Sequence, residues 1–273
     1  MALRVGVLTD LHHVQDPSRR GGWINRYDFA GVVERCERAI ELFTREGVSR
    51  VLLLGDLAHD GDLASVRQIV RAAGSSVPLL AVGGNHDSPD PTKRIAAAGR
   101  DRVQLPGWRA LGPDAVRLAG LRPARRARRR WAAARRPALT TWSDSPVLLA
   151  SHFPVLSHVR AITGHGLPYA GDLVDHADVA QALVARGAPT VVACGHLHVR
   201  YSVASGPLLQ LGLGALVEPP FDATLLELER KGHSLEVVRR ARELDEARER
   251  RDPRLVPAEE IWRFAPGRGW RRG

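Results

Sequence analysis

Short apolar runs that end in polar clusters organise most of this chain. Four runs are continuous and short enough to predict buried strands: Val51 to Leu54, Leu79 to Val82, Val147 to Ala150 and Thr190 to Ala193. A fifth, half-apolar run extends from Leu3 to Thr9. An Asp, Asn or His residue comes within three positions of the end of each run, so the pattern predicts strands whose carboxyl ends carry polar side chains.

Apolar residues at helical spacing predict helices between several of these strands. Asp28 is expected to cap one helix that ends at Gly47, and Asp62 to cap a second that ends at Gly74. A third helix is expected from about 175 to 186. Strands that alternate with helices in this way are typical of an α/β fold built on a parallel sheet.

The pattern changes in the last quarter of the chain. Strand-like runs follow one another without helices at Leu208 to Val217, Ala223 to Leu228 and Ser234 to Val238, which predicts a second, mostly antiparallel sheet. A charged segment and a Pro/Gly/Arg/Trp-rich end come next. We therefore predict one domain over 1–240 and a charged C-terminal helix and tail over 241–273.

The polar clusters carry the candidate chemistry. They are Asp10-Leu11-His12, Gly55-Asp56, Gly84-Asn85-His86-Asp87, Ser151-His152 and Gly195-His196-Leu197-His198. In an open parallel sheet, ligands gather outside the carboxyl ends of the strands, so these clusters should converge. Imidazole, carboxylate and amide oxygen are ligands for Mn, Fe or Zn. There are too many candidates for one ion with open positions, whereas two ions sharing a carboxylate would use them all.

The ordered motifs DLH, GD, GNHD, H and GHLH resemble those of the calcineurin-like metallophosphoesterases. The resemblance runs from Asp10 to His198 and continues through the strands to about Val238. It implies an α/β fold, a four-layer α/β/β/α sandwich of two mixed sheets. It also implies a dinuclear metal site at the carboxyl ends of the strands.

The resemblance implies a role for each motif residue. Asp10, His12 and His198 would hold one metal, Asp56 would bridge, and Asn85, His152 and His196 would hold the other. His86 would contact the phosphate and protonate the leaving oxygen, and Asp87 would orient its imidazole and raise its basicity. Any single histidine could instead be an ordinary hydrogen-bonded residue, but burying the whole set without metal would be costly.

The motif pattern is most similar to that of bacterial cyclic-nucleotide and related small-molecule phosphodiesterases. The predicted activity is hydrolysis of a small nucleotide-like phosphodiester by a metal-bridging hydroxide. A phosphomonoesterase, a nucleotide pyrophosphatase, a DNA nuclease and a non-catalytic binding scaffold are the alternatives. Arg26, His59 and Arg160 lie near the motifs or in neighbouring loops and are candidates for substrate contact.

Charge modifies this interpretation only slightly. The net charge is +10, and residues 122–136 read RPARRARRRWAAARR. Such a segment could bind nucleic acid or an anionic membrane, but like-charge blocks are often merely solvated insertions, which we favour here. The expected partner is therefore a small phosphoester rather than nucleic acid.

The remaining composition fits a single enzyme domain. A length of 273 residues with 44% apolar content allows one large α/β domain with a sizeable core. No run reaches the length of a membrane-spanning helix, and no leader is evident at the start. Cys36 and Cys194 are too few for a disulfide framework and are expected to pack in the core. These features predict a cytoplasmic protein.

Overall fold

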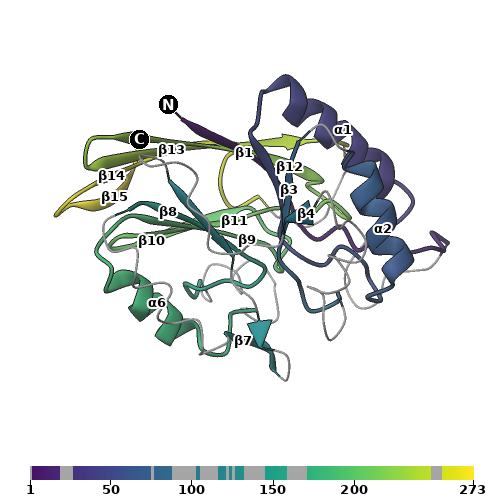
Figure 1. The fold of residues 1–273 in the computed structure, drawn as a ribbon, viewed down its shortest axis with the longest axis horizontal. Coiled ribbons are helices and arrows are strands. Elements are labelled where there is room, and N and C mark those ends of the chain that lie inside the picture. The colour runs from purple at the N-terminus through teal and green to yellow at the C-terminus, as the bar shows by residue number, and fades with distance from the viewer. Residues whose placement is uncertain are drawn as a thin grey trace.

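The structure is a computed structural model, and its elements form two mixed sheets with helices on their outer faces (Figure 1). It describes residues 2–18, 27–74, 77–87, 103–104, 116–120, 123–124, 127–131, 145–158, 171–246 and 254–273. None of the helices within these ranges has the length and apolarity that a bilayer crossing requires.

The first sheet has the strand order β15-β14-β13-β12-β1-β2-β3-β4. Its strands are β1 (Leu3–Leu8), β2 (Arg50–Leu53), β3 (Leu79–Ala81), β4 (Val103–Gln104), β12 (Asp222–Lys231), β13 (Ser234–Glu243), β14 (Glu259–Ala265) and β15 (Gly269–Arg272). From β1 to β4 the strands are parallel, and from β1 to β15 each pair is antiparallel.

The second sheet has the order β10-β11-β9-β8-β5. Its strands are β5 (Arg117–Gly120), β8 (Val147–Ser151), β9 (Thr190–Cys194), β10 (Tyr201–Ser205) and β11 (Leu208–Gly212). All its pairs are parallel except β10 with β11. In the arginine-rich segment, β6 (Pro123–Ala124) and β7 (Ala127–Trp131) pair separately, and the other residues of 122–136 lie outside the described ranges.

The four-layer arrangement is confirmed by how the strand faces are buried. Helices α1 (Val32–Arg45) and α2 (Leu63–Ala72) pack with Leu8 and Leu53 on the outer face of the first sheet. Val5 and Val7 face the second sheet. Helix α6 (His176–Val184) covers that sheet's outer face (Figure 1). The strand period of two sends alternate side chains into different cores, so the sheets are buried on both faces.

The prediction of a second, mostly antiparallel sheet is wrong. The predicted strand at 208–217 ends at Gly212 and lies parallel to β9 in the second sheet. β12 and β13 instead extend the first sheet on the other side of β1. A local apolar pattern identifies a strand but does not specify which sheet edge it will join.

The prediction of a charged C-terminal helix and tail is also wrong for the described residues. β13 continues to Glu243, and β14 and β15 add two more strands, while residues 247–253 lie outside the described ranges. The charges are not all solvated, because the buried Arg239 pairs with the buried Glu260 at 2.7 Å between β13 and β14. Arg200 similarly pairs with Asp222 through two hydrogen bonds.

The two predicted helix caps have different outcomes. Asp62 caps α2 as predicted, because its carboxylate accepts a hydrogen bond from the Ser65 N–H at 2.8 Å. Asp28 does not cap α1, which has Gly31 at its N-cap. Asp28 instead forms an ion pair with Arg35 at 2.6 Å.

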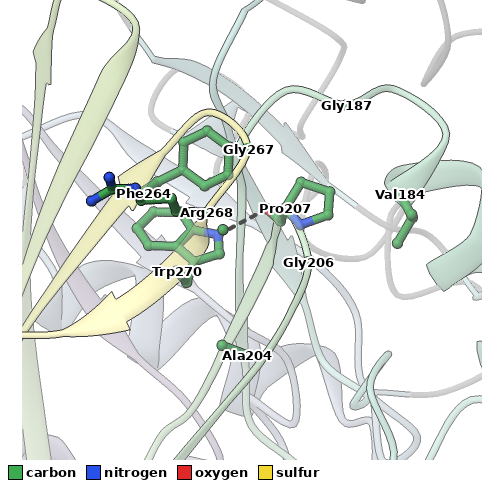
Figure 2. A pocket seen from close by; sticks show the side chains of 10 residues that line it. Val184, Gly187, Ala204, Gly206, Pro207, Phe264, Gly267, Arg268 and Trp270 are labelled. Carbon is green, nitrogen blue, oxygen red and sulfur yellow. Dashed lines mark hydrogen bonds between the residues drawn. The ribbon is translucent and has the colours of Figure 1, made fainter.

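A groove lies where the edge strands of the two sheets approach each other (Figure 2). It has a volume of about 460 Å³, and its lining includes Pro207, Phe264 and Trp270. The Trp270 indole N–H donates to the Pro207 carbonyl at 2.8 Å, which ties β15 to the second sheet. Pro207 precedes β11, so the groove lies at the end of the sheet opposite the polar clusters.

Both cysteines should be unreactive while the protein is folded. Cys36 and Cys194 are fully buried and free, and burial raises the pKa of each thiol to about 12. At pH 8 we expect no reaction with a chromogenic disulfide in the native protein and two thiols per chain in guanidinium. Cys36→Ala should reduce the denatured count to one. Rapid labelling of either thiol in the native protein would contradict the described core.

Candidate metal centre

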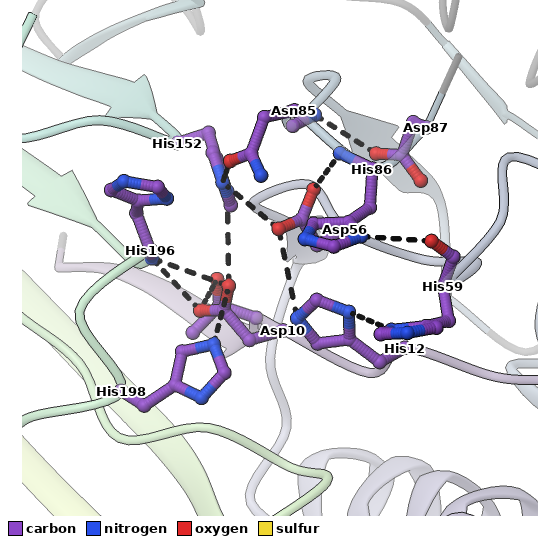
Figure 3. Close-up of polar contacts among 12 residues, drawn as sticks. Asp10, His12, Asp56, His59, Asn85, His86, Asp87, His152, His196 and His198 are labelled. Carbon is purple, nitrogen blue, oxygen red and sulfur yellow. Dashed lines mark hydrogen bonds and ion pairs between the residues drawn. The ribbon is translucent and has the colours of Figure 1, made fainter. Parts of the chain in front are cut away.

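The polar clusters meet at one end of the sandwich, beyond β1, β2, β3, β8 and β9 (Figure 3). Backbone hydrogen bonds join neighbouring loops within each sheet, and the His196 N–H donates across to the Asp10 carboxylate of the other sheet at 3.0 Å. The Asp10 N–H donates to the Gly55 carbonyl at 3.2 Å, and the Gly195 N–H donates to the His152 carbonyl at 3.1 Å. The convergence predicted from the strand order is therefore observed.

The backbone at this site is held in conformations that non-glycine residues rarely adopt. Among the described residues, six non-glycine residues have positive φ, and five of them belong to the motifs: Asp10, His12, Asp56, His196 and His198. Left-handed backbone at such residues costs on the order of 1–3 kcal/mol each, and such residues cluster at functional sites. The surrounding structure therefore offsets the cost of this backbone conformation, which places the motif side chains at the site.

Two motif glycines allow the loops to approach closely. A Cβ atom on Gly84 would lie 2.1 Å from the Asp56 carboxylate. One on Gly195 would lie 1.9 Å from the Thr9 hydroxyl. Glycine is therefore required at both positions, because a side chain at Gly84 would displace the Asp56 carboxylate and one at Gly195 would displace the Thr9 hydroxyl that donates to Asp10.

The predicted ligands fall into two groups. Asp10, His12 and His198 form one, and Asp56, His152 and His196 form the other, with candidate ligand atoms within 4.8 Å of one another in each. Asp56 Oδ2 lies between the groups, 3.6 Å from His12 Nε2 and 3.2 Å from His152 Nε2. This geometry fits the predicted bridging carboxylate.

Two buried carboxylates dominate the electrostatics. Burial raises the pKa of Asp10, but the charges of His198 and His152 outweigh it and hold that pKa below its usual range. Burial also raises the pKa of Asp56, and His152 again outweighs it. Burial lowers the pKa of His152, but Asp56 and Asp10 raise it to about 9. Two ionised carboxylates in this interior thus require nearby positive charge, which a cation would supply.

The nitrogen of His12 nearest to Asp56 supports a metal site. Burial lowers the pKa of His12 well below its usual value, so the ring is neutral and can offer a lone pair. Its Nε2 atom is buried and has no hydrogen-bond partner within the described residues. In the other group, His152 Nε2 lies 3.0 Å from Asn85 Oδ1. The residues fit divalent ions with nitrogen and oxygen ligands.

The structure places His86 at the site but does not support the predicted role of Asp87. His86 Nδ1 donates to the His59 carbonyl at 2.8 Å, and its backbone N–H donates to Asp56 Oδ1 at 2.8 Å. The Asp87 carboxylate accepts hydrogen bonds from the backbone N–H groups of Leu57 at 2.7 Å and Gly84 at 2.9 Å. Asp87 thus joins two site loops, and a backbone carbonyl orients the imidazole instead (Figure 3).

Glu218 is a further residue of the site that the sequence motifs do not include. Its carboxylate lies 2.5 Å from His198 Nδ1, leaving Nε2 to face Asp10 at 3.3 Å. Burial lowers the pKa of His198, but Asp10 and Glu218 raise it well above its usual value. A carboxylate on the second nitrogen fixes the orientation of a metal-binding histidine. Its signal was available, since Glu218 directly follows the apolar run ending at Val217.

Of the three candidates for substrate contact, only His59 lies within the residues that the structure describes. His59 lies beside His12 and His86, with its ring stacked on His86 at 4.9 Å between centroids. Arg26 and Arg160 lie outside the described residues.

Removing the Glu218 carboxylate should weaken metal binding without unfolding the protein. In Glu218→Gln, we expect the affinity for Mn²⁺ to fall by about 10–100-fold because the His198 ring loses its charged partner. Isothermal titration calorimetry measures this, with Glu41→Gln on the exposed face of α1 as the matched control. Equal affinity in Glu218→Gln and wild type would contradict the role.

Comparisons with solved structures find proteins of similar fold. A dimetal phosphatase from Danio rerio is similar in structure, with a TM-score of 0.69 at 15% identity, covering 88% of this chain and 96% of that one. The protein TT1561 of Thermus thermophilus is similar with a TM-score of 0.56 at 16% identity, covering 87% of this chain and 98% of that one. GAP50, the anchor in the inner membrane complex of Plasmodium, is similar with a TM-score of 0.60 at 11% identity, covering 88% of this chain and 84% of that one.

These identities are low, so the structural similarities establish the fold alone. A comparison with the curated proteins gives no match. The family model for calcineurin-like phosphoesterases matches residues 3–200, which is most of the chain and includes every polar cluster. This protein belongs to the calcineurin-like phosphoesterase family.

Proposed function

We propose that this protein is a phosphodiesterase that hydrolyses a small nucleotide-like diester with two metal ions, Mn and/or Fe or alternatively Zn. Membership of the family supports metal-dependent phosphoester hydrolysis. The observation that carries the proposal is the position of Asp56 Oδ2 between the two ligand groups. One carboxylate shared by two groups is the arrangement required by a dinuclear hydrolase.

The ligand roles proposed here are those expected from the motifs. Asp10, His12 and His198 would hold one ion, Asn85, His152 and His196 would hold the other, and Asp56 would be shared between them. Bound ions would supply a nucleophile from water at neutral pH and offset negative charge on the phosphoryl oxygens. The Asn85 amide group can donate a hydrogen bond to one of those oxygens.

His86 is the proposed proton donor to the leaving oxygen. A carbonyl oxygen only accepts, so the contact with His59 places a proton on His86 Nδ1. Its Nε2 atom is then the one that exchanges a proton with the substrate. A diester of an alcohol or nucleoside has a poor leaving group, which benefits most from such a donor.

The alternatives differ in substrate or in catalysis. A phosphomonoesterase or nucleotide pyrophosphatase would use the same centre on a terminal phosphate or a diphosphate. A DNA nuclease would bind with a steep salt dependence. A binding scaffold that has lost catalysis would lack ligands, whereas every predicted position here is filled and faces the site. The prediction of cytoplasmic location accords with two free, buried cysteines.

Hydrolysis of bis(p-nitrophenyl) phosphate against p-nitrophenyl phosphate, with Mn²⁺ present, tests the proposed activity. We expect a clear preference for the diester, abolished by chelation. Asp56→Asn should lower the rate by more than about 100-fold and reduce bound metal, because the amide is uncharged and keeps only one of the two carboxylate oxygens. Asp178→Asn, on the exposed side of α6, is the matched control. A preference for the monoester would indicate a phosphomonoesterase instead. Full activity in Asp56→Asn would contradict the proposed metal-dependent hydrolysis.

The role of His86 predicts a dependence on the leaving group. His86→Ala should retain metal but lose turnover by about 10²–10⁴-fold on diesters of poor leaving groups, where proton transfer matters most. The loss should be smaller for p-nitrophenyl esters, whose leaving group departs without a proton. Rates for a series of aryl and alkyl diesters measure how the loss in His86→Ala depends on the pKa of the leaving group. Equal losses for all esters would exclude His86 as the proton donor.

A further inference from the structure

His59 connects two residues of the proposed metal centre without belonging to either ligand group. Its ring Nδ1 lies 3.2 Å from His12 Nδ1, and its carbonyl oxygen accepts the hydrogen bond from His86 Nδ1 at 2.8 Å. The segment is anchored by the backbone, since the His59 N–H donates to the His13 carbonyl at 3.0 Å. Figure 3 shows His59 on the side of His12 away from Asp56.

The contact between the two Nδ1 atoms determines which nitrogen carries each proton. A neutral imidazole has one N–H and one lone pair, so two nitrogens at hydrogen-bond distance need one donor and one acceptor. His12 must keep the lone pair on Nε2 if it is to bind an ion beside Asp56. Its proton is then on Nδ1, and His59 Nδ1 is the acceptor.

We propose that His59 is a positioning residue for His12. Its Nδ1 accepts the proton of His12 Nδ1–H and fixes the ring with Nε2 directed toward Asp56. Metal-binding histidines usually have a carboxylate or a backbone carbonyl in this place, as Glu218 does for His198. The inference rests on the proposed function, because it assigns a role relative to its metal site.

A third ion held by the histidines is the competing explanation. His12, His59 and His86 also form a cluster with candidate ligand atoms within 4.8 Å. One neutral imidazole cannot offer lone pairs from both nitrogens, so His12 cannot serve the Asp10 group and a third ion together. His86 Nδ1 is already committed to a carbonyl. A hydrogen bond between His12 and His59 therefore gives more of these ring nitrogens a partner than a third ion would.

Two substitutions separate the acceptor atom from the ring. His59→Phe keeps a ring that can stack on His86 but removes the acceptor. His59→Asn removes the ring but places an acceptor oxygen, Oδ1, on the same Cγ atom as His Nδ1. Both leave the backbone carbonyl that contacts His86. His233→Asn, in the exposed turn between β12 and β13, is the matched histidine control.

Calorimetric titration of each full-length variant with Mn²⁺ alone tests the inference, with thermal unfolding in chelator as the check on folding. We expect His59→Phe to bind about 10–100-fold more weakly with unchanged stoichiometry. His59→Asn should stay within about threefold of wild type because the acceptor is retained. If His59→Phe does not fold, His59→Ala replaces it in the same comparison.

Three results would overturn the positioning role. They are wild-type affinity in His59→Phe, equal weakening in both variants, or one ion fewer per chain in both, which would make His59 a ligand. If wild type binds Mn²⁺ normally and hydrolyses diesters in these cases, the proposed function stands and only this inference fails. If wild type binds no metal, the proposed function itself fails.

Discussion

The site depends on two carboxylates that are buried between the two sheets and need positive charge beside them. Asp10 and Asp56 are almost completely buried, and both have pKa values held below the usual range. An ionised group in such an interior needs a partner of opposite charge close by. His152 and His198, in the loops after β8 and β9, supply that charge, as their raised pKa values indicate, and bound metal ions would supply it instead.

Much of the surrounding structure serves this arrangement. Left-handed backbone at the motif residues and glycines at the close approaches allow five loops to converge on a small volume. Outside the ligand groups, Glu218, Asp87 and His59 hold the rings or loops in place. The chemistry of the motif residues thus depends on groups drawn from both sheets.

The sequence predicted the strands that carry the site and the residues at their ends, because both are local properties. A buried strand such as β8 is a continuous apolar run, and His152 follows it directly. The sequence patterns of β12 and β13 did not predict which sheet they join, because the choice of sheet depends on the free edge of β1 and not on the strands' own residues. The orientation of Asp87 was missed because its partners Leu57 and Ala58 come from another loop. The buried ion pair of Arg239 with Glu260 was missed for the same reason, because its partners come from two strands, β13 and β14.

Two ions should bind at this site, one on each side of Asp56. Crystals grown with Mn²⁺ and measured above the manganese absorption edge would test it directly through the anomalous difference map. We expect two peaks, one beside His12 and His198 and one beside His152 and His196, with Asp56 in contact with both. A single peak, or peaks that leave Asp56 without metal, would contradict it.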